Sequence, residues 1–482
     1  MTDISNGPRI TRRTALAGAL GAAAVAATGR PALAHGTGRP ALAHDSTRQP
    51  NFLYIMADDM GYADLSCYGR IEYQTPVLDH LARQGMRFTH AYANSAVCTA
   101  TRVGLITGRY QYRLKVGLQE PLGGDDVGLP PEHPTIASLL RAKGYHTALI
   151  GKWHMGGLPK YGPMKSGYDE FWGNRGGGVD YFTHSIGGKE DLWDGETPIH
   201  EVGYYTTLLA DRAIAQLAER AEAGKPFFTS LHFTAPHWPW EGPNDQAESD
   251  RLASKTGPGL HIDDFDGGNM ATYAAMVTEL DRQIGRILAK LTELGLDQNT
   301  VVVFTSDNGG ERFAFNWPFT GRKTELLEGG LRIPAIVRWP GVTLPETQST
   351  VPIMSMDWLP TFVAAAGGAP DPAYPTDGTD VRAALLGQNL PERPLFWRFK
   401  NKDQKAHRRG KWKYLSIGGN EFLFDVVADP LERGNWKERE PERFAQMKAA
   451  FDAWDATMLH DPDAPSYGFP PNELADHFGY DS

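Results

Sequence analysis

The feature that most limits the fold is a recurring alternation of short apolar runs with stretches of helical periodicity. The apolar runs are rich in β-branched and aromatic residues, as buried strands are; they are Asn51–Met56, His146–Ile150, Phe227–Phe233, Thr300–Thr305 and Ala335–Trp339. The helical patterns between them are Thr75–Gln84, Thr135–Ala142, Tyr204–Ala223 and Tyr273–Leu294. Strands that alternate with helices predict an α/β protein with a large, mostly parallel sheet sandwiched by helices.

Four of the predicted strands lead directly into charged or metal-binding residue types. In chain order these residues are Asp58 and Asp59, Lys152 and His154, His237, and Asp307 and Asn308. In open α/β sheets, ligands bind just beyond the carboxyl ends of the strands. We therefore expect these side chains to meet at one edge of the sheet and to form a single site.

Cys98 begins the segment CTATRVGLITGR, which runs to Arg109. The segment is similar to the signature of type I sulfatases, in which a Cys is followed by Pro or Ala, then Arg, and then Thr-Gly-Arg. The resemblance implies that a formylglycine-generating enzyme oxidises Cys98 to formylglycine, an aldehyde whose hydrate attacks a sulfate ester. Cys67 is the other cysteine, so a disulfide or an inert buried thiol is the alternative. We also expect Cys98 near the N-terminus of a helix, which favours anions.

Oxygen-rich side chains at two strand ends predict a divalent cation. Asp58, Asp59, Asp307 and Asn308 offer hard oxygen ligands of the kind that Ca²⁺ prefers. Either pair alone is equally typical of a turn or a helix cap. The resemblance extends to both pairs, since sulfatases hold a cation, usually calcium, with an early Asp-Asp and a late Asp-Asn. It also implies that the modified Cys98 contributes an oxygen ligand.

The same resemblance implies roles for the basic residues. Lys152, His237 and Lys323 match the family elements that clamp the sulfate, and His237 or Lys323 protonates the departing alcohol. Arg102 orients the modified residue 98, and His154 removes a proton from it to regenerate the aldehyde. Asp307 takes the proton of the attacking hydroxyl. Without the resemblance, each of these side chains would be read as a solvated cation or a structural histidine.

Two further histidines and several loop aromatics lie near the predicted site in the sequence. We expect His232 and His184 to be structural, with His184 a candidate substrate contact. The aromatics either contact the alcohol part of a substrate or pack against one another within the loops. They are Trp238, Trp240, Phe315, Trp317 and Phe319.

The two ends of the chain differ from the middle. Residues 1–43 contain Arg12 and Arg13 followed by an Ala- and Gly-rich apolar run, which predicts a twin-arginine signal that is removed on export to the periplasm or medium of a bacterium. The apolar run is too short to span a membrane, and we expect no stable membrane span.

We expect a catalytic domain at 44–375 and a C-terminal α+β subdomain at 376–482. That subdomain has strand-like runs at Leu395–Phe399, Lys411–Ile417 and Phe422–Val426 and a helix at Glu440–Leu459. The resemblance implies an alkaline phosphatase-like fold whose smaller C-terminal part is an antiparallel sheet plus a helix.

Net charge restricts the partners. The chain carries a formal charge of −10, which argues against nucleic-acid binding. A basic run, Lys400 to Lys413, is interpreted as a solvated edge. We expect an arylsulfatase-type hydrolase acting on a small sulfate ester. The alternatives are a formylglycine-dependent phosphonate or phosphate monoester hydrolase and, if Cys98 stays unmodified, a non-catalytic binder of sulfated glycans.

Overall fold

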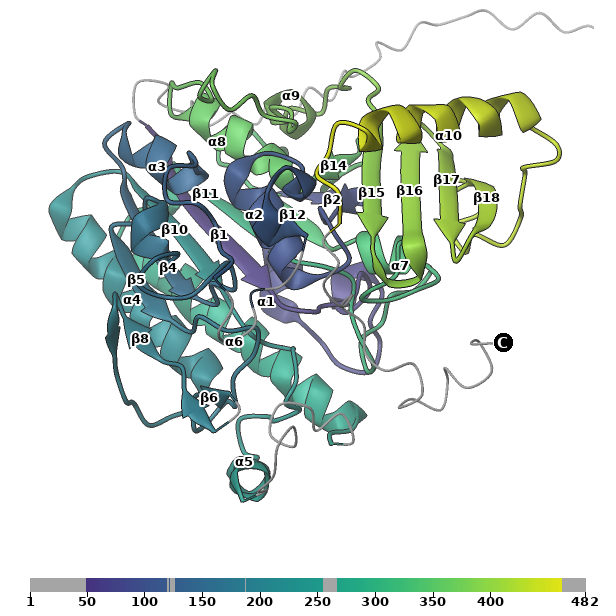
Figure 1. Cartoon of the computed structure of the whole chain (residues 1–482). Coiled ribbons are helices and arrows are strands. Elements are labelled where there is room, and N and C mark those ends of the chain that lie inside the picture. Colours follow the sequence, from purple (N-terminus) through teal and green to yellow (C-terminus); the bar gives the residue numbers. More distant parts are fainter. Residues whose placement is uncertain (1–48, 119–120, 122–125, 187, 255–266, 462–482) are drawn as a thin grey trace, which may run out of the picture. The chain divides into compact units, whose positions relative to one another are not determined.

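A ten-stranded mixed sheet forms the centre of the computed structural model, which describes residues 49–118, 121, 126–186, 188–254 and 267–461 (Figure 1). Its strands, in spatial order, are β13 (Thr347–Ser349), β2 (Met86–Phe88), β12 (Ala335–Arg338), β11 (Thr300–Ser306), β1 (Asn51–Ala57), β10 (Phe227–His232), β4 (His146–Gly151), β5 (Glu170–Gly173), β8 (Trp193–Asp194) and β9 (Thr197–Pro198). The strands from β11 to β5 are parallel to one another. β3 (Ala91–Tyr92) pairs with β14 (Ile353–Met354), and β6 (Ser185–Ile186) pairs with β7 (Lys189–Glu190).

Helices cover both faces of this sheet because successive side chains of a strand point to opposite sides. On β1, Leu53 and Ile55 belong to the apolar cluster that includes α1 (Pro76–Gln84), α4 (Tyr205–Ala223) and α6 (Met270–Glu293). Phe52 and Tyr54 belong to the cluster on the other face, with α2 (Cys98–Thr107), α3 (Ile136–Arg141) and α8 (Trp358–Ala365). The remaining helices of this part are α5 (Gln246–Ala253), α7 (Glu328–Leu331) and α9 (Arg382–Leu385). The predicted α/β sandwich is therefore confirmed.

The five predicted strands and four predicted helices are all present, with bounds that differ by a few residues. β12 is antiparallel to both of its neighbours, β11 and β2. An apolar run shows burial on both faces and carries no information on strand direction, so the sequence did not reveal this reversal.

A second, four-stranded antiparallel sheet follows, in the order β15 (Leu395–Phe399), β16 (Gln404–Arg409), β17 (Trp412–Ile417) and β18 (Asn420–Asp425). Three of these strands were predicted, and β16 was interpreted as part of a solvated basic edge. That interpretation is wrong for Arg408 and Lys413, which are buried. Their charges are compensated inside the protein, so their burial leaves no apolar pattern in the sequence.

The last helix, α10 (Pro441–Asp455), packs on the second sheet through Met447 and Phe451. It also contacts the main part of the protein through Trp454, whose ring lies 5.1 Å from that of Tyr110. The boundary predicted at residue 375 falls in a stretch without helix or strand between α8 and α9. It stays a prediction, and so does the signal segment 1–43, which lies outside the described residues.

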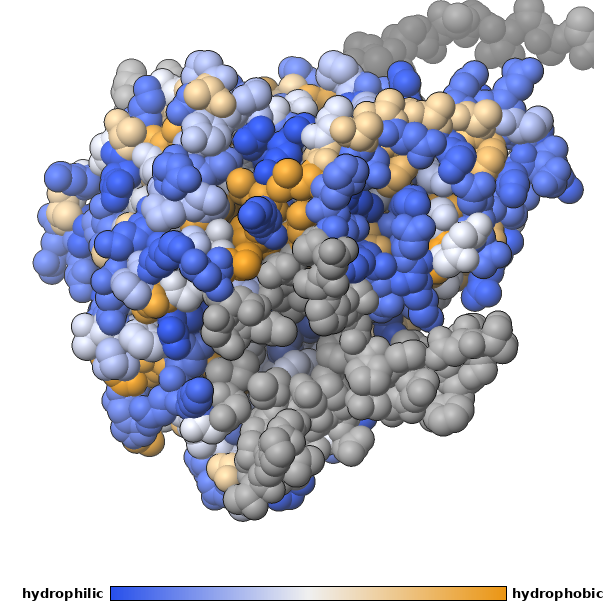
Figure 2. All heavy atoms as spheres, in the orientation of Figure 1, coloured by the Kyte–Doolittle hydropathy of each residue, from blue (hydrophilic) through white to orange (hydrophobic). Residues whose placement is uncertain are grey.

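Hydrophilic residues dominate the coloured surface on the face shown in Figure 2, and hydrophobic ones gather in a small area near the middle. Among the residues that the structure describes, no helix combines the length and the hydropathy needed to cross a bilayer.

Candidate active site

The carboxylates predicted to bind a cation meet at the carboxyl ends of β1 and β11. The two strands are paired in register so that Ala57 lies opposite Ser306, which brings the residues after each strand together. The backbone N–H of Asp59 donates a hydrogen bond to Oδ1 of Asp307 at 3.1 Å. Asp59 adopts a left-handed backbone conformation, with φ of 59°, that turns the chain sharply after the strand.

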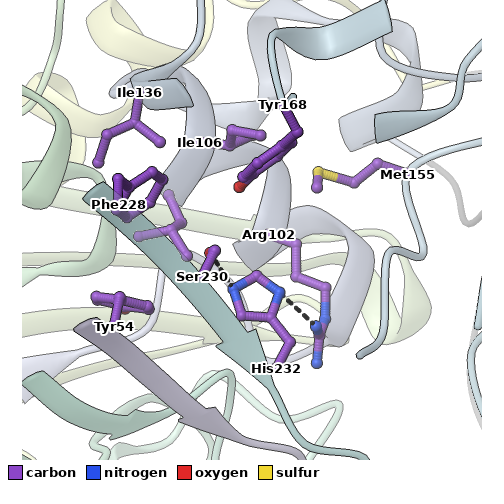
Figure 3. A pocket seen from close by; sticks show the side chains of 10 residues that line it. Tyr54, Arg102, Ile106, Ile136, Met155, Tyr168, Phe228, Ser230 and His232 are labelled. Carbon is purple, nitrogen blue, oxygen red and sulfur yellow. Dashed lines mark hydrogen bonds between the residues drawn. The ribbon is translucent and has the colours of Figure 1, made fainter. Parts of the chain in front are cut away.

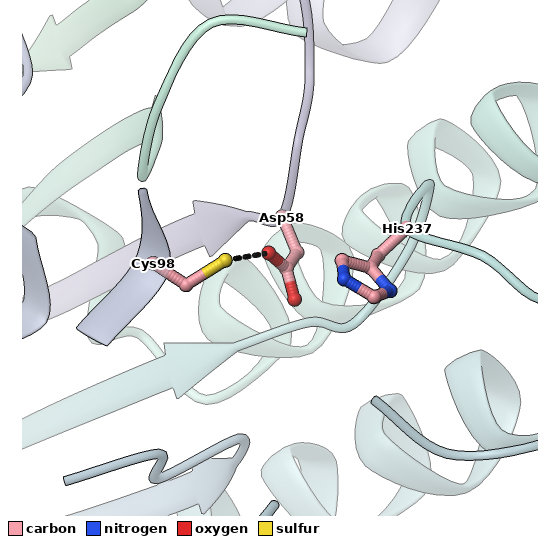
Figure 4. A group of neighbouring side chains, drawn as sticks. All are labelled: Asp58, Cys98 and His237. Carbon is pink, nitrogen blue, oxygen red and sulfur yellow. Dashed lines mark hydrogen bonds between the residues drawn. The ribbon is translucent and has the colours of Figure 1, made fainter. Parts of the chain in front are cut away.

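Cys98 is the first residue of α2 and is buried against these carboxylates. Its Sγ atom lies 3.3 Å from Oδ1 of Asp58 and 3.9 Å from Oδ1 of Asp59 (Figure 4). Both Cys98 and Cys67 are free thiols, so the disulfide alternative is wrong. The expected helix after Cys98 is present, and its unpaired N-terminal N–H groups favour an anion at this position.

The donor set suits a hard divalent cation. Ligand atoms of Asp58, Asp59, Cys98 and Asp307 all lie within 4.8 Å of one another and are buried. Asn308 Nδ2 donates to Asp59 at 2.7 Å, while its buried Oδ1 has no hydrogen-bond partner among the described residues. An oxygen left without a partner beside three carboxylates is what a site for Ca²⁺ or Mg²⁺ requires.

Three basic side chains neutralise the carboxylates. Lys152 Nζ lies 2.5 Å from Oδ2 of Asp58, and Lys323 Nζ lies 2.7 Å from Oδ2 of Asp59. Arg102 is fully buried and donates to Oδ2 of Asp307 at 2.8 Å. All three predicted cations are therefore in the site, each beside a different carboxylate.

Both predicted site histidines are buried at its edge. His237 Nε2 lies 3.6 Å from Oδ2 of Asp59, and its Nδ1 lies 2.6 Å from the carbonyl oxygen of Trp238. His154 has a left-handed backbone conformation, with φ of 54°, and its Nδ1 has no partner among the described residues. A Cβ atom added at Gly177 would lie 2.6 Å from the His154 ring. The loop after β5 therefore needs glycine there to approach the site.

The two remaining histidines have structural contacts, as expected. His232 lies between Ser230 Oγ, at 2.8 Å, and Nη1 of Arg102, at 3.3 Å. Figure 3 shows this arrangement beside a small cavity that has room for about one water molecule. His184 is buried with its Nε2 3.0 Å from the carbonyl oxygen of Gly203.

Burial and neighbouring charges shift the pKa values of different site residues in opposite directions. Burial and the neighbouring Asp307 raise the pKa of Asp58 to about 8. Burial also acts to raise the pKa of Asp307, but Arg102 and Lys152 outweigh it and hold that pKa well below its usual range. Burial and the same lysine lower the pKa of His154 well below its ordinary value, so this imidazole is neutral.

The Cys98 thiol is also held in its neutral form. Burial raises its pKa well above the ordinary value, and Asp307 and Asp58 raise it further. Because the thiolate is the reactive form of cysteine, this position gives an unmodified thiol little nucleophilic character.

Sequence reasoning missed one acidic residue of the site. Glu311 is buried, and its Oε2 lies 3.9 Å from Nζ of Lys323. A single Glu in a loop carries no motif or periodicity, so no signal in the sequence pointed to it. Of the loop aromatics, Trp240 and Phe319 are buried, whereas Trp317 is 59% exposed.

The family model named Sulfatase matches residues 50–369 of the chain. Human (Homo sapiens) arylsulfatase A is 33% identical over 405 residues, which cover 80% of this chain and 78% of that protein. Mouse (Mus musculus) arylsulfatase J is 29% identical over 458 residues, covering 82% of this chain and 74% of that protein. A crystal structure of Ps i-CgsB in complex with k-i-k-neocarrahexaose aligns with a TM-score of 0.78 and 29% identity, covering 87% of this chain and 95% of that one.

The range matched by the family model includes the Cys98 segment, both acidic pairs and the basic residues that the fold brings together. The chain therefore belongs to the sulfatase family and is an arylsulfatase-like hydrolase of sulfate esters.

Proposed function

We propose that this enzyme is an arylsulfatase-type hydrolase of small sulfate monoesters and that its nucleophile is formylglycine made from Cys98. The observation that carries the proposal is the position of Cys98, which lies at the start of α2 and next to carboxylates from two strand ends. A thiol held neutral by burial is a poor nucleophile there. Formylglycine would supply two hydroxyls as its hydrate, one to attack sulfur and one to allow release of the sulfate.

The divalent cation, which we propose to be calcium, would be held by Asp58, Asp59, Asp307, Asn308 and residue 98. It would supply positive charge beside the sulfate oxygens. The three carboxylates are otherwise neutralised by the lysines and by Arg102. With a cation held there, the ammonium groups of Lys152 and Lys323 would be available to bind the sulfate.

Anion binding and proton transfer use overlapping sets of side chains. Lys152, Lys323 and His237, which lie beside the carboxylates of Asp58 and Asp59, would bind the sulfate oxygens. Either His237 or Lys323 gives a proton to the departing alcohol oxygen, which leaves as the neutral alcohol. Asp307 accepts the proton of the attacking hydroxyl, and Arg102 keeps that carboxylate ionised and oriented.

His154 would act as the base for the second hydroxyl. Its Nδ1 has no hydrogen-bond partner among the described residues and is the nitrogen that would accept the proton. Thr99 Oγ1 donates to the His154 carbonyl oxygen at 2.8 Å, which ties this residue to the first turn of α2.

We also propose that a formylglycine-generating enzyme modifies Cys98 in the cytosol and that the twin-arginine translocase then exports the folded protein. The sequence of residues 11–27 supports this order, because the twin-arginine route carries proteins that are already folded. Export without cleavage near Ala34 or Ala43 would contradict the signal interpretation.

Turnover of an aryl sulfate against the matching aryl phosphonate monoester tests the activity. The protein is produced with a formylglycine-generating enzyme, and the aldehyde at residue 98 is verified with a hydrazide reagent. We expect a higher kcat/KM for the sulfate, and loss of both activities in Cys98→Ala. The half-buried Cys67 provides the matched control, and Cys67→Ala should keep the wild-type rate.

A preference for the phosphonate would favour the alternative hydrolase. An unreactive residue 98, with sulfated glycans bound but not hydrolysed, would favour the non-catalytic binder.

A further inference from the structure

The loop that carries Lys323 is fixed on one side by the main part of the protein. The Lys323 N–H donates to the carbonyl oxygen of Gly310 at 3.2 Å, and the Thr324 N–H donates to that of Ala96 at 2.9 Å. Ala96 precedes Cys98 by two residues, so this contact ties the Lys323 loop to the start of α2. Thr324 has a φ of 72°, in the left-handed region that a β-branched residue rarely adopts. The turn therefore needs external contacts to hold it.

The second sheet supplies those contacts through Gln404, the first residue of β16. Gln404 Oε1 accepts the N–H of Leu326 at 2.8 Å, and Gln404 Nε2 donates to the carbonyl oxygen of Thr324 at 2.8 Å. The residue is 3% exposed, so neither bond competes with bulk water. One amide thus closes the turn on the side opposite to Ala96.

A buried ionic cluster holds the end of the same loop. Lys413 Nζ lies 3.0 Å from Oε1 of Glu328 and 2.9 Å from Oε1 of Glu432. The N–H of Glu328 donates to Oε2 of Glu432 at 2.7 Å. Lys413 is fully buried, so these contacts fix the start of α7 to β17 and to the loop after β18.

We propose that Gln404 is a positioning residue for Lys323, so that the second sheet sets the place of a sulfate-binding ammonium group. This inference rests on the proposed role of Lys323. A catalytic group that shifts by about 1 Å can cost a hundredfold in rate. Removal of the Gln404 amide leaves the left-handed Thr324 with its N–H bond to Ala96 as its remaining backbone hydrogen bond among the described residues, so we expect the adjoining Lys323 to be held less precisely.

A double-mutant cycle on kcat/KM for an aryl sulfate tests the coupling. Gln404→Met keeps the length of the side chain and removes both hydrogen bonds to the Lys323 loop, together with the bond from Gln404 Nε2 to the carbonyl oxygen of Asn401 at 3.1 Å; we expect kcat/KM to fall about ten- to a hundredfold. In a Lys323→Ala background the same substitution should change kcat/KM by less than about twofold, because the positioned group is gone. The inhibition constant of inorganic sulfate should rise in Gln404→Met. In the Lys323→Ala background, Gln404→Met should leave that constant unchanged.

Tyr414→Phe is the matched control, because Tyr414 is buried on the adjacent β17 and its OH donates to Glu421 at 3.0 Å, away from the loop. It should keep kcat/KM within about twofold. If Gln404→Met does not fold, Gln404→Glu, which keeps the acceptor for the Leu326 N–H, completes the same cycle.

Equal losses from Gln404→Met with and without Lys323, or a folded Gln404→Met with wild-type kcat/KM, would overturn the proposal. A Lys323→Ala variant with wild-type turnover would instead remove the role of Lys323 and the positioning proposal with it. Absence of sulfate turnover in wild-type protein with a verified aldehyde would show that the proposed function itself has failed.

Discussion

Replacement of Arg102 by Met should destabilise the folded protein by about 3–5 kcal/mol, the usual cost of breaking a buried ion pair. Arg102 is fully buried and donates to Asp307 at 2.8 Å and to the carbonyl oxygen of Lys152 at 3.2 Å. Its guanidinium also lies 3.7 Å from Oδ2 of Asp58. Without it, the neighbouring carboxylates of Asp58 and Asp307 remain buried without their guanidinium partner.

Urea unfolding followed by tryptophan fluorescence, with a chelator present, measures this cost without any contribution from a cation. The second substitution, Asp307→Asn, identifies the cause. In the double variant both charges are absent. Its loss of unfolding free energy should therefore be smaller, by about 2 kcal/mol, than the sum of the losses in the two single variants. Arg338→Met is the control: Arg338 Nη2 donates to the carbonyl oxygen of Asp297 at 2.9 Å, and its loss should cost about 1 kcal/mol. Additive losses, or an Arg102→Met variant no less stable than the control, would refute the reasoning.

Three other predictions concern the cation site, a buried glutamate and the proton donor. Calcium added to chelator-treated protein should raise the unfolding temperature, by the equivalent of about 2.7 kcal/mol at a hundredfold excess over Kd, and Asp59→Asn should abolish most of the rise. An unchanged temperature in wild-type protein would contradict the cation site. Burial and the neighbouring Asp180 raise the pKa of Glu241 from 4.5 to about 9. The folded state therefore binds a proton that the unfolded state releases, and stability should fall as pH rises across that window, by up to about 1.4 kcal/mol per unit. Glu241→Gln should flatten this dependence in urea unfolding, and an unaltered slope would count against it. Finally, kcat is measured for a series of aryl sulfates whose leaving phenols differ in acidity, in Lys323→Ala and in His237→Ala. The variant in which kcat depends more steeply on that acidity has lost the proton donor. A steeper dependence in neither variant would exclude both.

Much of the site could be predicted because parallel strands deliver their next residues to a common edge. Asp58 and Asp307 are distant in sequence, yet pairing of β1 with β11 makes them neighbours. The Cys98 motif added what periodicity cannot supply, the position of a nucleophile between those strand ends. The predicted carboxylates, Lys152 and the two histidines lie in the site for this reason, whereas Lys323 was predicted from the resemblance alone.

Polar burial explains what the sequence did not reveal. Lys413 and Arg408 lie in a run of basic residues, and such runs are usually solvated. Their partners, Glu328 and Tyr92, belong to the main part of the protein, so nothing near them in the sequence indicates burial. Gln404 was missed for the same reason, because its amide pairs with backbone groups about eighty residues earlier in the chain.

The mass of the tryptic peptide that extends from Phe88 to Arg102 tests the central claim most directly. In purified protein that hydrolyses an aryl sulfate, we expect this peptide to carry an aldehyde at residue 98, with –CHO in place of –CH₂SH. A full complement of intact thiol in protein that still turns over the ester would contradict the account.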